Sequence, residues 1–198
     1  MKENDTEIST LLMHGQVWNF QDPTGWYISE KLDGYRAFWD GSKLYSKNGT
    51  LFPIPLDFTH SFPSNICLDG ELWAGYDVNN LNSIIRKTAS KLESPQNLEE
   101  LWKDVKFCVF DAPMHPGHYQ ERHQFASSSI SGCNPNICMV PIEPCLGLDH
   151  LQSKLNEITK KQGEGIMLYS PSAKYTSGRT KNLLKVKAYI EEDVKFVK

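Results

Sequence analysis

The stretch WYISEKLDGYRAFWDG, residues 26–41, decides the fold. It contains two runs rich in aromatic and β-branched residues, Trp26 to Leu32 and Tyr35 to Trp39, which is typical of strands. The dipeptide Asp40-Gly41 favours a tight turn, and Asn48-Gly49 makes a second one only a few residues later. Two such turns within ten residues predict an antiparallel meander.

The rest of the chain adds helices and further strands. Apolar residues at helical spacing before Pro95 predict an amphipathic helix; they are Leu81, Ile84, Ile85, Thr88 and Leu92. A second helix is expected over 97–104, and a third from a cap at Asp149 to Gly163. The remaining expectations are a Ser, Gly and Asn-rich loop at Ser127 to Asn136 and strands at Ile66 to Trp73, Val105 to Phe110, Gly165 to Tyr169 and Leu183 to Tyr189. The sum is an α+β domain built on antiparallel sheets with flanking helices.

Length and composition narrow the class of protein. The chain has 198 residues and a formal net charge of −3, so one domain is expected, and any contact with nucleic acid must come from a local basic cluster. No apolar run approaches the ~18 residues of a membrane helix, and the polar start is unlike a targeting peptide. We therefore expect an intracellular protein, in cytoplasm or nucleus, without membrane contact.

Cysteine and histidine give no metal-binding pattern. Five cysteines are an odd number in a chain too large to need disulfides, so reduced thiols are expected. Cys133 and Cys138 lack a second pair at zinc-site spacing and are predicted to lie in a loop. His115, His118 and His123 are likewise expected on a loop surface.

The densest polar group among apolar neighbours is Lys31-Leu32-Asp33-Gly34-Tyr35-Arg36. On extended backbone Lys31 and Asp33 project to the same side, and the glycine permits a bend that returns Arg36 toward them. A partly desolvated lysine beside fixed positive charge loses part of its preference for the ammonium form, as a nucleophilic amine requires. Taken alone, the hexapeptide favours a salt bridge around a turn over a nucleophilic site, because surface ion pairs of this kind are common.

Four further motifs accompany this hexapeptide in order along the chain: Asp69-Gly70-Glu71, Phe107-x-x-Phe110-Asp111, Glu164-Gly165-Ile166 and Lys185-Val186-Lys187. Together the five resemble the covalent nucleotidyltransferases, and within that superfamily the minimal ATP-dependent DNA ligases. The resemblance implies a nucleotidyltransferase fold, ATP-grasp-like, in which ATP lies between two antiparallel sheets. It also implies that Lys31 takes AMP from ATP as a phosphoramidate and passes it to the 5′-phosphate of a DNA nick, which the 3′-hydroxyl then seals.

The same resemblance assigns roles to individual residues. Lys185 and Lys187 clamp the α-phosphate, while Arg36 and Arg179 hold the nucleotide or the nick phosphate. Glu164 is the expected carboxylate near Mg²⁺ or Mn²⁺, with Glu71 as a second candidate. Asp33 and Glu71 share the ribose-contacting and step-specific tasks; Phe110, or in its place Phe107, stacks on adenine; and backbone groups near Ser29 and Glu30 select the purine.

Two departures from the family pattern bear on activity. Ser46-Lys47-Asn48-Gly49 stands where relatives carry Ser-Arg-x-Gly, so lysine replaces an arginine that grips phosphate. The chain is expected to be a single adenylylation domain, 1–198, without the OB-fold domain and sixth motif of relatives, and hence to charge slowly with ATP and seal little.

The expected partners are ATP and nicked duplex DNA, and the expected state is a monomer. The basic stretch for DNA is Lys174, Arg179, Lys181, Lys185 and Lys187. The pathway would be DNA repair or replication. The alternatives are an RNA ligase or capping-type nucleotidyltransferase, and a non-catalytic nucleotide or DNA-binding module on the same scaffold.

Overall fold

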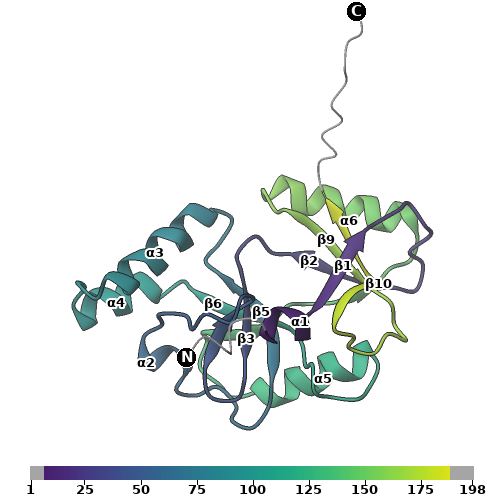
Figure 1. The fold of residues 1–198 in the computed structure, drawn as a ribbon. Helices are drawn as coiled ribbons and strands as arrows, with labels where there is room; N and C mark the ends of the chain where they lie inside the picture. The colour runs from purple at the N-terminus through teal and green to yellow at the C-terminus, as the bar shows by residue number, and fades with distance from the viewer. Residues whose placement is uncertain (1–6, 188–198) are drawn as a thin grey trace, which may run out of the picture.

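The computed structural model describes residues 7–187, which form two five-stranded sheets with helices around them (Figure 1). Sheet A has the strand order β1 (Met13–Val17), β10 (Gly178–Lys187), β9 (Gly165–Tyr169), β2 (Tyr27–Lys31), β8 (Glu143–Pro144). Sheet B has the order β4 (Leu44–Ser46), β3 (Tyr35–Trp39), β5 (Leu68–Trp73), β6 (Lys106–Asp111), β7 (Ile137–Met139). The helices are α1 (Glu7–Leu11), α2 (Leu56–Thr59), α3 (Val78–Ser90), α4 (Pro95–Trp102), α5 (Tyr119–Ile130) and α6 (Leu148–Lys160).

The α+β class and the two sheets are confirmed, but the sheets are not antiparallel throughout. Each has one parallel pair at an edge: β1 with β10 in sheet A and β6 with β7 in sheet B. A parallel pair requires a long crossover connection, and α5 lies in the one between β6 and β7. The β1–β10 pair joins the two ends of the described chain, so no local pattern could indicate its direction.

Apolar faces of both sheets are covered by helices, as the left and upper right of Figure 1 show. Sheet B packs with α2, α3 and α4 around a core that includes Trp39, Phe62 and Phe107. Three of the expected inward positions of α3 are confirmed, because Leu81, Ile84 and Thr88 are buried. Ile85 is half-buried, and the expectation for Leu92 was wrong, since it lies beyond the end of the helix and is exposed. Sheet A packs against α6 instead, in a separate core.

A third hydrophobic cluster joins the two sheets through stacked aromatic rings. Tyr119 of α5 and Tyr169 of β9 lie parallel, with ring centroids 3.8 Å apart and an interplanar angle of 3°. Both side chains are almost fully buried, and Met13 and Leu183 complete the cluster. The relative position of the sheets, and so the shape of any cavity between them, depends on this contact.

Several local expectations were wrong. Helix α5 continues through Ser127 to Ile130 where a loop was expected, and it contains His123, which is half-buried with Nε2 2.8 Å from the Val140 carbonyl oxygen. Helix α6 begins at Leu148, one residue before the predicted cap.

Cys138 was also misplaced, since it lies in β7 and not in a loop. The last residues of the predicted strand 183–189 lie outside the described range. Within residues 7–187 no helix has the length and apolar character needed to cross a membrane.

Candidate active site

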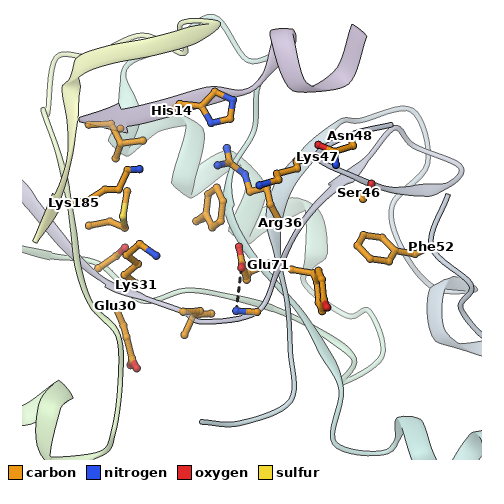
Figure 2. A pocket seen from close by; sticks show the side chains of 18 of the residues that line it. His14, Glu30, Lys31, Arg36, Ser46, Lys47, Asn48, Phe52, Glu71 and Lys185 are labelled. Carbon is orange, nitrogen blue, oxygen red and sulfur yellow. Dashed lines mark hydrogen bonds between the residues drawn. The ribbon is translucent and has the colours of Figure 1, made fainter. Parts of the chain in front are cut away.

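A cavity of about 730 Å³ lies between the two sheets. In Figure 2 one wall comes from sheet A, with Lys31 and Lys185, and the opposite wall from the β3–β4 side of sheet B, with Ser46 to Asn48 and Phe52. Arg36 and Glu71 lie between these walls. The volume falls within the range of small-molecule sites.

Lys31 is the last residue of β2 and points into this cavity. Its Nζ lies 2.5 Å from Oε2 of Glu164, the residue that immediately precedes β9. The pairing follows from the register, because Lys31 lies opposite Gly165. Both side chains are only about a quarter exposed, 22% and 28%, so the ion pair is partly desolvated.

The bend after Lys31 depends on Gly34. A Cβ at this position would come within 2.1 Å of the Leu72 carbonyl oxygen, so only glycine permits the close approach of this bend to β5. The Gly34 amide donates to Oε1 of Glu71 over 3.2 Å (Figure 2, dashed line). Burial raises the pKa of Glu71 to about 7, although Arg36, Lys31 and this hydrogen bond oppose the shift.

Arg36 is held in place by a bidentate ion pair. Its Nε and Nη2 donate to the two carboxylate oxygens of Asp69, each over 2.7 Å, and Nη2 also donates to the Met13 carbonyl oxygen over 3.0 Å. The Tyr175 hydroxyl donates to the same carboxylate over 2.6 Å. Burial disfavours the charged guanidinium, but Asp69 outweighs it and raises the pKa of Arg36.

The two candidate stacking residues are separated by the alternation of β6. Phe110 lines the cavity, and the Arg36 guanidinium lies over its ring at 4.9 Å from the centroid. Phe107 points to the opposite face, is fully buried and stacks on Phe62 in the core of sheet B. The alternative that Phe107 stacks on a base is therefore wrong.

Cations accumulate along β10. Burial, together with the charges of Lys31, Arg179 and Lys187, lowers the pKa of Lys185. Lys185 lines the cavity, whereas Arg179 and Lys187 are exposed and lie outside its lining. Lys47, the residue in place of an arginine, does line the cavity.

Like Arg179 and Lys187, Asp33 does not line the cavity, and the Glu30 side chain is turned away from Lys31. Strand β2 ends at Lys31, so Asp33 no longer follows the strand alternation; it is exposed and outside the cavity lining. The Glu30 carboxylate points away from Lys31 (Figure 2), and its Oε1 is buried without a hydrogen-bond partner among the described residues. Ser29, on the Lys31 side of β2, is buried at the cavity wall.

Sequence reasoning missed much of the cavity lining, and most of the missed residues are apolar or aromatic. They include His14, Ile85, Met167, Tyr169 and Leu183. The alternation of β9 places Met167 and Tyr169 on one face, which is a usable signal. His14 reaches the cavity only because β1 pairs with β10, where it lies opposite Arg179. No sequence signal pointed to that pair.

A divalent cation is compatible with the residues present. Within residues 7–187 there is no cluster of three or more His, Cys, Asp or Glu side chains arranged around a metal site. Mg²⁺ at nucleotide sites needs only one or two carboxylates plus phosphate oxygens and water. Glu164 fits this role better than Glu71, because a carboxyl with its pKa near 7 is partly neutral at physiological pH.

This chain resembles known proteins in both sequence and structure. The family described as ATP dependent DNA ligase domain matches residues 14–187. The chain is 31% identical to the DNA ligase of Haemophilus influenzae over 179 residues, which covers 89% of this chain and 62% of that protein. It therefore spans less than two thirds of that relative's length.

Solved structures agree with this match. A Lig E DNA ligase, described as binding DNA with a minimal scaffold, superposes with a TM-score of 0.78 at 30% identity, over 89% of this chain and 68% of that one. The ligase of bacteriophage T7 in complex with ATP superposes with a TM-score of 0.66 over 91% and 69%; at 15% identity it shows the fold alone.

Proposed function

Because this chain belongs to the ATP-dependent DNA ligase domain family, we propose that its cavity binds ATP and that Lys31 captures AMP from it. The adenylate would then pass to the 5′-phosphate of a nick in duplex DNA, and the 3′-hydroxyl would displace it to seal the strand. The observation that carries the proposal is the position of the Lys31 amine, inside a nucleotide-sized cavity between a carboxylate and a second cation.

The cavity offers a separate surface for each part of the nucleotide. The ring of Phe110 provides a face on which adenine can stack, and Arg36 already lies over that ring. Glu71 supplies a hydrogen-bonding group for the ribose. Backbone groups of the β2 segment at Ser29 and Glu30 are left to select the purine, since the Glu30 side chain points away.

The transfer step requires the Lys31 amine to be neutral when it attacks. Glu164 Oε2, 2.5 Å from Nζ, is placed to accept the ammonium proton. The nitrogen lone pair then forms a bond to the α-phosphorus, and the bond from this phosphorus to the bridging oxygen breaks, so pyrophosphate leaves. Lys185, on the same wall, would stabilise charge that develops on the α-phosphate, with Lys187 and Arg179 contributing at longer range.

A bound Mg²⁺ or Mn²⁺ would neutralise phosphate charge and orient the leaving group. Glu164 would hold it as a carboxylate once the proton taken from Lys31 has passed on to solvent, with Glu71 as the second candidate ligand. Asp33 is kept as a candidate for a later step on DNA because it is exposed in the bend after β2.

The DNA backbone would lie along the exposed cations of the β10 region. Lys174, Arg179, Lys181 and Lys187 are all exposed, and this local cluster is compatible with a net charge of −3 for the whole chain. We expect one copy of the chain to act on one nick, which light scattering of the DNA complex can check.

The decisive experiment is covalent labelling. The protein is incubated with ATP labelled on the α-phosphate and with Mg²⁺; label should become attached through an acid-labile, alkali-stable bond. Lys31→Ala should abolish the labelling, while Lys103→Ala, at an exposed lysine of the loop after α4, should leave it unchanged. Folded protein that takes no label at any concentration would overturn the proposal and favour a non-catalytic binding module.

Substrate choice is tested separately. Labelled GTP accepted better than ATP would favour a capping-type enzyme, and a preference for nicks with an RNA 3′-hydroxyl strand would favour an RNA ligase. Charging without sealing would match a unit that spans 62% of its relative's length.

A further inference from the structure

A pair of cysteines on the edge strand β7 of sheet B and its neighbour β6 lies outside the chemistry described so far. Cys108 of β6 and Cys138 of β7 are direct partners in the parallel register, and their sulfur atoms are 3.7 Å apart. Neighbouring strands lie about 4.8 Å apart, which is within the Cα separation that a disulfide spans. Rotation about the side-chain bonds is therefore enough to bring the sulfurs to bonding distance.

The two thiols differ in access. Cys108 is buried, at 5% exposure, whereas Cys138 is half-buried at the edge of the sheet. A small reagent can therefore reach Cys138 first, and the sulfur of Cys108 is already in contact with it. The hydrogen bond with Cys108 lowers the pKa of the Cys138 thiol, with a contribution from Lys106 and against the effect of burial. Cys138 is therefore the thiol of the pair that loses its proton more readily and gives the reactive thiolate.

We propose that Cys108 and Cys138 form a thiol–disulfide exchange site that small-molecule disulfides oxidise to an intramolecular bond. The Cys138 thiolate attacks one sulfur of oxidised glutathione and expels one glutathione thiolate. Cys108 then loses its proton to solvent and attacks the Cys138 sulfur of this mixed disulfide, which expels the second glutathione. Two protein thiols are oxidised and one glutathione disulfide is reduced to two thiols.

The bond would connect two parts of the chain that matter for the cavity. The closed loop, 108–138, contains Phe110, and Cys108 lies opposite Glu71 in the β5–β6 register. The same loop contains all of α5, which carries Tyr119 of the stacked pair. Oxidation would therefore restrain the edge strand β7 together with the element that joins the two sheets.

Reduced protein incubated with oxidised glutathione at pH 7.5 tests the site. Peptide mapping should recover a Cys108–Cys138 linkage with a loss of about 2 Da, and the oxidised protein should unfold at a higher denaturant concentration than the reduced one. Cys108→Ser should stop at a stable glutathione adduct on Cys138, and Cys138→Ser should leave Cys108 unmodified. Cys67→Ser is the matched control and should oxidise like the wild type.

The outcomes separate this site from other thiol chemistry. A wild-type protein that keeps glutathione on Cys138 without releasing it, or that links Cys138 to Cys133, would overturn the proposal. So would an unfolding midpoint that does not change on oxidation. None of these readouts depends on adenylylation, so the proposal stands or falls independently of the ligase chemistry.

Discussion

Two arginine–aspartate pairs lie next to each other in this molecule, and they have the same chemistry in different surroundings. Asp69 of β5 and Asp111 of β6 are partners in the sheet register, and each carboxylate accepts hydrogen bonds from two nitrogens of one arginine. Arg36 comes from β3 and its side chain is 20% exposed, so we call Arg36–Asp69 the exposed pair. Arg122 comes from α5 and is 0% exposed, so we call Arg122–Asp111 the buried pair.

The remaining contacts of each arginine explain the difference. Arg122 Nη1 donates to the carbonyl oxygens of Gly117 and Ala173, over 3.0 and 2.7 Å, so this pair fastens α5 to the segment after β9. Arg36 Nη2 also reaches the other sheet, at the Met13 carbonyl oxygen of β1, but its guanidinium lies over the ring of Phe110 at the cavity wall. Both pairs therefore connect the sheets, and partial exposure leaves only Arg36 available to a ligand.

The largest expected loss of stability comes from a substitution in the buried pair. Arg122→Leu leaves the Asp111 carboxylate buried without its counter-ion, and we expect the free energy of unfolding to fall by about 3–5 kcal/mol. Chemical denaturation of the reduced protein measures it. The double variant Arg122→Leu with Asp111→Leu should regain part of the loss, because no unpaired charge remains. A loss below about 1 kcal/mol would contradict the structural role.

The corresponding substitution in the exposed pair should lower the stability less and the affinity for ATP more. Arg36→Leu leaves Asp69 with the Tyr175 hydroxyl and with water from the cavity, so we expect a loss of about 2–3 kcal/mol in unfolding free energy. ATP affinity should fall at least about tenfold, since a charge-assisted phosphate contact is lost. Equilibrium binding of ATP to a folded variant measures this. Equal stability losses at Arg36 and Arg122 would remove the distinction.

The sequence pointed to the residues of the exposed pair but not to their pairing. Arg36 and Asp69 both lie in charged motifs within short, strand-like runs, yet Arg36 was expected beside Lys31 and Asp33, and the structure pairs it with Asp69. The buried pair was not anticipated. Arg122 lies in a stretch whose histidines and serines suggested surface loop. Its role depends on a helix packed between two sheets, which is a tertiary property.

The same limit applies to the cavity lining. Phe107 and Phe110 could not be separated by hydrophobicity, because both are apolar; only the observed strand alternation assigns one to the core and one to the cavity. His14 required the pairing of β1 with β10, between residues more than 160 positions apart. Local patterns thus predicted many of the elements, though not α5, β1 or β7, and pointed to the charged motifs, while the contacts between distant elements came from the structure.

The Glu71 carboxyl, close to the exposed pair, gives a pH dependence. Its pKa is raised to about 7 in the folded protein, above the usual value of about 4.3 for an unfolded chain. Between these two pKa values the folded state binds the Glu71 proton more tightly than the unfolded state does. The bound proton therefore contributes its full stabilisation of the fold below about pH 4, and this contribution is lost as the pH rises through 7. We expect a contribution on the order of 2 kcal/mol.

Urea denaturation at pH 5.5, 7.0 and 8.5, without nucleotide or metal, measures this dependence. Glu71→Gln cannot ionise, so its stability relative to the wild type should increase with pH. Glu99→Gln, at an exposed position of α4, should keep the wild-type slope. A constant difference between Glu71→Gln and the wild type across this range would show that Glu71 does not titrate there.

The smallest change removes one hydroxyl that supports the exposed pair. The Tyr175 hydroxyl donates to Asp69 over 2.6 Å and accepts from the Met13 amide over 3.0 Å, so Tyr175→Phe leaves a buried amide without its partner. We expect a loss of about 1–2 kcal/mol in unfolding free energy. Tyr119→Phe is the matched control and should lose less, because its hydroxyl donates over a longer distance, 3.3 Å, to the Phe110 carbonyl oxygen. If Tyr175→Phe cost as much as Arg36→Leu, the hydroxyl and not the guanidinium would be the main partner of Asp69, and the exposed pair would owe its geometry to the segment that precedes β10.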